Sequence, residues 1–125
     1  MKNKILVVDD EAVARNLLVD MLSDEGYDVI TAVDGEEGLQ KASSELTDLI
    51  ILDLLMPKIA GGTLAAKLRA DKKTSHIPIL FLTGMINKDE ADLMCNQLSC
   101  ELLLTKPFNR DELLTMVARA IRKEK

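Results

Sequence analysis

Short apolar runs alternate with longer amphipathic stretches along the whole chain, and this alternation constrains the fold more than any other feature. Four runs contain no polar residue, and they cover residues 5–8, 49–52, 79–82 and 102–104. Strands that are apolar on both faces are typical of a parallel sheet covered by helices on each side. With a weaker strand at residues 28–32, the pattern predicts five strand–helix units in a doubly wound α/β fold.

Helices are expected between these strands. They are predicted at residues 11–25, from Glu36 to Ala42, at 63–70, at 88–97 and after residue 109. The first helix carries an apolar stripe of helical period that should face the core, formed by Val13, Leu17, Leu18, Met21 and Leu22. Asp34 and Asn109 stand where helix-capping side chains are expected.

Length and charge limit the classes of protein that this chain can belong to. Its 125 residues suit one domain, over residues 1–125, and are too few for two. A formal net charge of −5 argues against direct nucleic-acid binding. No signal-peptide pattern or membrane-length apolar run is present. We therefore expect a cytoplasmic protein without a membrane partner, with Cys95 and Cys100 as free thiols.

Charged or hydroxyl side chains stand where the strong apolar runs stop. The first run ends in Asp9-Asp10, and the others end in Asp53, Thr83 and Lys106. In an open parallel sheet, ligands bind beyond the carboxyl ends of the strands, near the point where strand order reverses. If these strands are neighbours, the five side chains converge on one cleft.

Such a cleft favours a divalent cation and phosphoryl chemistry. Three crowded carboxylates repel one another, and a hard cation removes that repulsion. Mg2+ suits a site with few protein ligands because it keeps several waters. One carboxylate beside the metal can act as a nucleophile. Lys106 and Thr83 can balance the charge on transferring phosphoryl oxygens.

The sequence resembles the receiver domains of two-component response regulators, including stand-alone chemotaxis-type receivers. The likeness covers the whole chain. It rests on the motifs Ile5-Leu6-Val7-Val8-Asp9-Asp10-Glu11, Asp53-Leu54-Leu55-Met56-Pro57, Phe81-Leu82-Thr83-Gly84 and Leu104-Thr105-Lys106-Pro107-Phe108. The resemblance implies a five-stranded parallel sheet with helices on both faces and the flavodoxin-like strand order 2-1-3-4-5.

The resemblance also implies a role for each site residue. Asp53 would accept a phosphoryl group from a histidine kinase, and Asp10 would bind Mg2+ directly, together with Asp53. Asp9 would help through water, and the backbone carbonyl of Leu55 would complete the metal site. Lys106 would pair with the phosphoryl oxygens. Thr83 would swing toward the phosphoryl group and report activation.

By the same resemblance, the chain is a signalling switch and not an enzyme acting on other substrates. It would catalyse only its own phosphorylation and dephosphorylation. Its partners would be a sensor histidine kinase and either a downstream effector protein or a C-terminal output domain outside this chain. The surface formed by the fourth helix, the fifth strand and the fifth helix would change on activation, and a homodimer through that surface is left open.

Three positions depart from what is usual in the family or tune its chemistry. Leu103 stands three residues before Lys106, where receivers usually carry an aromatic ring, which puts aromatic-coupled switching in question. Leu55 and Met85 stand at the two positions that often tune phosphate lifetime. Because both are apolar, neither can easily orient an attacking water, and we predict slow self-dephosphorylation.

The sequence also admits three other interpretations. A pseudo-receiver would keep the fold as an interaction module without productive phosphorylation; Leu103 favours it mildly, and the complete set of polar residues opposes it. A phosphatase of the haloacid dehalogenase class would require an Asp-x-Asp motif after the first strand of a longer chain. A flavodoxin-like cofactor protein needs a phosphate-cradling first loop, and the acid pair would repel the phosphate there.

Overall fold

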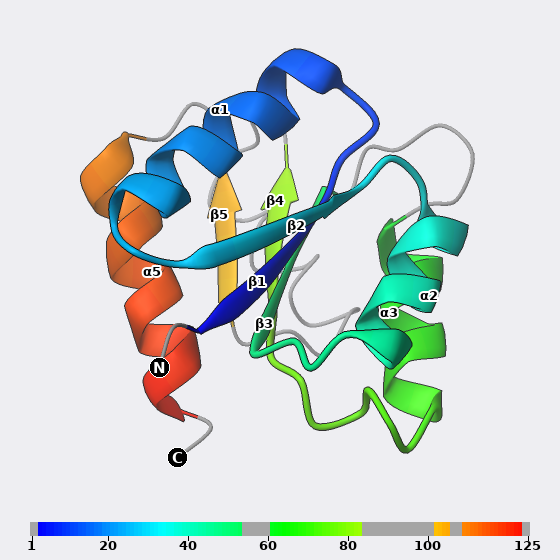
Figure 1. The fold of residues 1–125 in the computed structure, drawn as a ribbon. Helices are drawn as coiled ribbons and strands as arrows, with labels where there is room; N and C mark the ends of the chain where they lie inside the picture. Colours follow the sequence, from blue (N-terminus) through cyan, green and yellow to red (C-terminus); the bar gives the residue numbers. More distant parts are fainter. Residues whose placement is uncertain (1–2, 54–60, 84–101, 106–108, 124–125) are drawn as a thin grey trace.

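The computed structural model describes residues 3–53, 61–83, 102–105 and 109–123, and for residues 61–65, 83, 102, 105 and 122–123 it describes only the backbone. Five parallel strands form one sheet in the order β2-β1-β3-β4-β5 (Figure 1). The strands are β1 (Lys4–Val8), β2 (Asp28–Ala32), β3 (Leu49–Asp53), β4 (Ile79–Thr83) and β5 (Leu102–Thr105). The predicted doubly wound sheet and its strand order are confirmed.

Four helices are described, and they cover both faces of the sheet. They are α1 (Ala12–Asp24), α2 (Gly35–Ser44), α3 (Gly61–Ala70) and α5 (Arg110–Lys123). Helices α1 and α5 lie on one face, and α2 and α3 lie on the other (Figure 1). The helix predicted at residues 88–97 lies outside the described residues.

Alternate residues of each central strand enter two separate apolar cores, which explains why the runs at residues 5–8, 49–52 and 79–82 contain no polar side chain. In β1, Ile5 packs on the side of α1 and α5, whereas Leu6 packs on the side of α2 and α3. In β3, Ile51 and Leu52 divide in the same way. Since all four side chains are fully buried, a polar residue at any of them would lose its contact with water.

The apolar stripe predicted for α1 was too broad. Leu18 and Leu22 are buried, and Met21 packs against the same core while partly buried. Val13 and Leu17 are instead 76% and 52% exposed. At about 100° per residue, these two positions lie at one edge of the stripe. The sheet covers only the narrower sector around Leu18 and Leu22.

The amino ends of β1 and β3 are joined by a set of contacts around Lys4. The backbone N–H of Lys4 donates to Oδ2 of Asp48 at 2.8 Å, and the backbone N–H of Asp48 donates to the carbonyl of Lys4 at 2.8 Å. The Lys4 ammonium pairs with Oε1 of Glu45 at 3.0 Å. The hydrogen bond to Glu45 favours the charged amine and raises the pKa of Lys4.

Both predicted helix caps are present. The Asp34 carboxylate accepts the backbone N–H of Glu37 at 2.9 Å at the start of α2. At the start of α5, Oδ1 of Asn109 accepts the backbone N–H of Glu112 at 2.8 Å. The Glu112 carboxylate in turn accepts the backbone N–H of Asn109 at 3.2 Å, which completes a capping box.

Asn109→Ala is expected to lower the free energy of unfolding by about 1 kcal/mol, because it leaves a helix N–H without its acceptor. Asn109 is exposed, so no cavity should add to this cost. Urea unfolding followed by circular dichroism measures the change. Asn109→Asp keeps the acceptor oxygen and should retain wild-type stability; equal stability of the Ala variant would show that the cap contributes nothing.

Candidate functional site

The strand register brings the ends of β1 and β3 together. Val8, the last residue of β1, pairs with Leu52. The next residues are Asp9, which follows β1 directly, and Asp53, the last residue of β3, so the two lie side by side at the end of the sheet. Asp10 is the residue after Asp9, so three carboxylates lie close to the ends of two neighbouring strands, at the carboxyl edge of the sheet.

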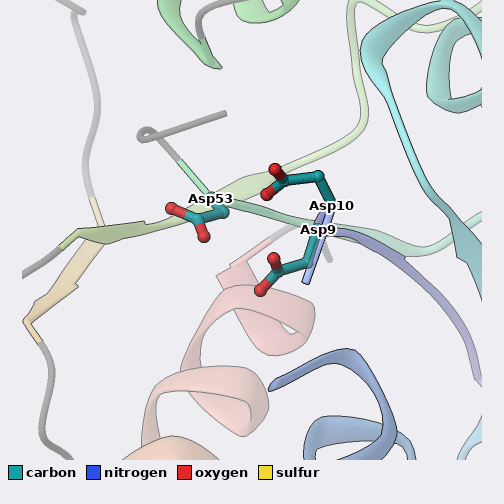
Figure 2. Close-up of side chains that lie close together, drawn as sticks. All are labelled: Asp9, Asp10 and Asp53. Carbon is teal, nitrogen blue, oxygen red and sulfur yellow. The ribbon is translucent and has the colours of Figure 1, made fainter. Parts of the chain in front are cut away.

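The three carboxylates form one cluster. Asp9, Asp10 and Asp53 each offer one carboxylate oxygen, and these oxygens all lie within 4.8 Å of one another. Figure 2 shows the side chains grouped where β1 and β3 end. Asp9 and Asp53 are only 1% and 6% exposed, whereas Asp10 is exposed. The cluster is thus buried on one side and open to water on the other.

Hydrogen bonds of its backbone and of its carboxylate hold Asp9 in place. Its backbone N–H donates to the carbonyl of Ala32 in β2 at 3.1 Å. Its Oδ1 accepts the backbone N–H of Glu11 at 2.9 Å. Its own carbonyl accepts Nη1 of Arg15 at 2.9 Å. These contacts fix the turn between β1 and α1, from which Asp10 also projects.

The donor set fits a hard divalent cation. Carboxylate oxygens are the ligands that Mg2+ prefers, and Mg2+ keeps several of its waters in protein sites. The exposed side at Asp10 leaves access for those waters. The two buried carboxylates are partly removed from water, which makes their mutual repulsion costly unless a positive charge offsets it.

The other predicted site residues are described only in part. Thr83 is the last residue of β4, which pairs with β3, and its backbone is in register with Thr105 of β5. The side chain of Thr83 is not among the described parts of the chain, and Leu55 and Lys106 lie outside the described residues altogether. Arg15, which contacts Asp9, was not singled out from the sequence; its only signal is a basic residue one turn into α1.

Together, the parallel sheet and the acid cluster beyond its carboxyl edge define a doubly wound α/β domain with a candidate metal site. The family model described as the response regulator receiver domain matches residues 5–118. The chain therefore belongs to the response regulator receiver family, whose members act in two-component signalling. Receiver domains generally bind Mg2+ at an acidic pocket and interact with histidine kinases.

Curated relatives of the chain are transcriptional regulators. It is 43% identical to the alkaline phosphatase synthesis transcriptional regulatory protein PhoP of Bacillus subtilis, over 98% of this chain and 50% of that protein. It is 37% identical to the DNA-binding dual master transcriptional regulator RpaA of Synechocystis, over 96% of this chain and 49% of that protein. The chain thus spans about half the length of these relatives.

Solved receiver structures share the fold along almost the entire chain. The chemotaxis response regulator CheY4 of Vibrio cholerae superimposes with a TM-score of 0.87 at 33% identity, over 96% of this chain and 99% of that one. Among the residues that the structure describes, no helix has both the length and the apolar character needed to cross a bilayer.

Proposed function

We propose that this chain is a phosphorylation-dependent switch that accepts a phosphoryl group from a histidine kinase on Asp53. The observation that carries the proposal is the approach of the Asp9, Asp10 and Asp53 oxygens to within 4.8 Å of one another. Asp53 ends the central strand β3, so the sheet itself holds this carboxylate in place. A rigid strand end is a suitable support for a nucleophile that must meet an incoming phosphorus atom.

The chain's own residues would divide the work of transfer. An Asp53 oxygen forms a bond to phosphorus as the bond from the donor's histidine nitrogen breaks. The electron pair stays on the imidazole, which a proton restores to its neutral form. Asp10 and Asp53 would hold Mg2+, with Asp9 acting through water and the carbonyl of Leu55 as a further ligand. When bound, Mg2+ offsets the carboxylate charge and polarises phosphoryl oxygens.

The switching part of the proposal concerns Thr83 and Lys106. Phosphorylation adds about −1.5 to −2 charge and strong hydrogen-bond acceptors. Thr83 and Lys106 would move to contact that group. Since Thr83 pairs with Thr105, a shift at the end of β4 would bear directly on β5. The surface formed by the fourth helix, β5 and α5 would then present a different face to a partner.

The partners follow from the same proposal. The donor is a sensor histidine kinase, and the output is carried by a downstream effector protein or by a C-terminal domain outside this chain. The relatives, which are about twice as long, are transcriptional regulators. The net charge of −5 favours leaving any DNA contact to such an output domain. A cytoplasmic location belongs to the proposal, and dimerisation stays open.

Mass spectrometry after incubation with Mg2+ and a small phosphodonor such as acetyl phosphate tests the proposal. We expect one added phosphoryl group, and no addition when a chelator removes the metal. A folded protein that takes up no phosphoryl group with Mg2+ present would identify it as a pseudo-receiver. The half-buried Leu103, which packs against the core on the side of α2 and α3, is the feature that favours that alternative.

We expect phosphoryl-Asp53 to decay slowly, because Leu55 and Met85, both outside the described residues, offer no side chain that could orient water. In the double variant Leu55→Asn with Met85→Gln, a new hydrogen bond to water should accelerate decay roughly fivefold to tenfold. Loss of the phosphoryl mass with time gives the rate. Leu46→Asn, at an exposed position, is the matched control; fast decay of the wild-type protein would contradict the prediction.

A further inference from the structure

We propose that Arg15 is a positioning residue for the acid cluster, because its guanidinium fixes the turn that carries Asp9 and Asp10. The inference rests on the proposed function, since it assigns Arg15 to the Mg2+ site of that function. Arg15 lies in the second turn of α1 and is partly buried. Its guanidinium is a cation that cannot bind Mg2+, so Arg15 would act only through the backbone of Asp9.

The contacts around Arg15 form a closed loop. Its Nη1 donates to the carbonyl of Asp9 at 2.9 Å, and its backbone N–H donates to the carbonyl of Glu11 at 3.0 Å. The backbone N–H of Glu11 donates to Oδ1 of Asp9 at 2.9 Å. Each end of the turn between β1 and α1 is therefore tied to the other through Arg15. We therefore expect a change at the guanidinium to alter the path of the backbone that carries Asp10.

The hydrogen bond from Arg15 to the Asp9 carbonyl is especially important because of how α1 begins. The N-cap residue of α1 is Glu11, and its side chain makes no capping hydrogen bond. Helices α2 and α5, in contrast, begin with side-chain caps from Asp34 and Asn109. The entry to α1 is instead held by the Asp9 carboxylate on one side and by the Arg15 guanidinium on the other.

Repulsion among the carboxylates of Asp9, Asp10 and Asp53 opposes their close approach. It favours moving Asp9 and Asp10 away from Asp53. A charge-assisted hydrogen bond to the Asp9 carbonyl resists that movement, because it anchors the backbone between the two acids. Residues that orient metal ligands in this way typically change metal affinity by about 10- to 100-fold when they are removed.

Positioning and simple electrostatics predict opposite signs for the effect of Arg15 on metal affinity. If only its charge mattered, removing a cation near the site would tighten Mg2+ binding, because less positive charge would oppose the ion. If Arg15 positions Asp10, removing it should weaken Mg2+ binding although one positive charge is lost. Arg15→Met keeps an apolar stem close to that of arginine and removes the guanidinium with its donors and charge.

Isothermal titration of the unphosphorylated full chain with Mg2+ tests the inference. We expect Arg15→Met to weaken Mg2+ binding roughly tenfold, and Arg15→Lys, which can still donate to the Asp9 carbonyl, to recover part of it. The phosphorylation rate with acetyl phosphate should shift to higher Mg2+ concentration while its maximum stays near the wild-type value. Arg69→Met, at an exposed position in the last turn of α3, is the matched control.

Each outcome decides one point. Unchanged or tighter Mg2+ binding by Arg15→Met, with the wild-type protein binding normally, overturns the inference and leaves the proposed function standing. A wild-type protein that binds no Mg2+ overturns both. If Arg15→Met does not fold, Arg15→Lys carries the test: it must then bind Mg2+ more weakly than wild type, and equal binding overturns the inference.

Discussion

Asp53→Asn is expected to abolish phosphoryl uptake from acetyl phosphate and from a histidine kinase. An amide has almost the same shape as a carboxylate, so the end of β3 should keep its structure. The amide cannot form the acyl phosphate bond, and it removes one charge from the cluster of Asp9, Asp10 and Asp53. Mass spectrometry of the protein after incubation with Mg2+ measures the result directly.

The matched control is Asp48→Asn, which makes the same chemical change immediately before the other end of β3. Asp48 accepts the backbone N–H of Lys4 at 2.8 Å, and the amide oxygen of asparagine can accept the same bond. We expect this variant to be phosphorylated at the wild-type rate. Full phosphorylation of Asp53→Asn would show that another carboxylate, such as Asp10, is the acceptor and would overturn the assignment.

Asp10→Asn is expected to have opposite effects on stability and on metal binding. Without metal, it should raise the free energy of unfolding by about 1 kcal/mol, because it reduces repulsion in the cluster while solvent screens much of the charge of the exposed Asp10. Removal of a residue that only orients a metal ligand typically weakens metal binding roughly 10- to 100-fold. Asp10→Asn should weaken Mg2+ binding by more than this, because Asp10 is expected to bind the metal directly.

Thermal unfolding with and without Mg2+ separates these two effects. At ten times its dissociation constant, Mg2+ should stabilise the wild-type protein by about 1.4 kcal/mol, which raises its Tm. The Asp10→Asn variant should begin with the higher Tm and gain little from the same Mg2+ concentration. If its Tm is lower than that of the wild-type protein without metal, the three carboxylates do not repel one another in the way proposed.

The fold could be predicted well from the sequence where one interaction dominated. The runs at residues 5–8, 49–52 and 79–82 had to be buried on both faces, and the structure divides each between two cores. The weak strand at Asp28–Ala32 is at the edge of the sheet, where most of its side chains are only partly buried. The strand order itself came from the family resemblance and not from the apolar pattern.

The prediction for α1 was wrong about the width of its buried face. Apolar residues at helical period fix the direction of a buried face but not its width, so Val13 and Leu17 could not be separated from Leu18. How much of a helix surface the sheet covers depends on how the helix is placed against it, which a single sequence does not contain. The exposed pair is the result of that placement.

The grouping of the site residues was predictable because strand ends are marked by the residues that terminate apolar runs. Asp9, Asp10 and Asp53 meet as expected from the parallel sheet. The contact of Arg15 with the Asp9 carbonyl was not predictable, since it spans six residues across a turn and depends on where α1 begins. The roles of Asp9, Asp10 and Asp53 stay predictions, as do those of Thr83, Lys106 and Leu55.

The contacts of Lys4 limit how the charged end of the sheet can respond to a new phosphoryl group. Because Lys4 and Asp48 exchange two hydrogen bonds, shear between β1 and β3 along their length is opposed at the far end of both strands. A change in the spacing between Asp10 and Asp53 must therefore come from torsion in the turn after Val8 or from side-chain rotation. The two strands would serve as a fixed frame against which other segments are displaced.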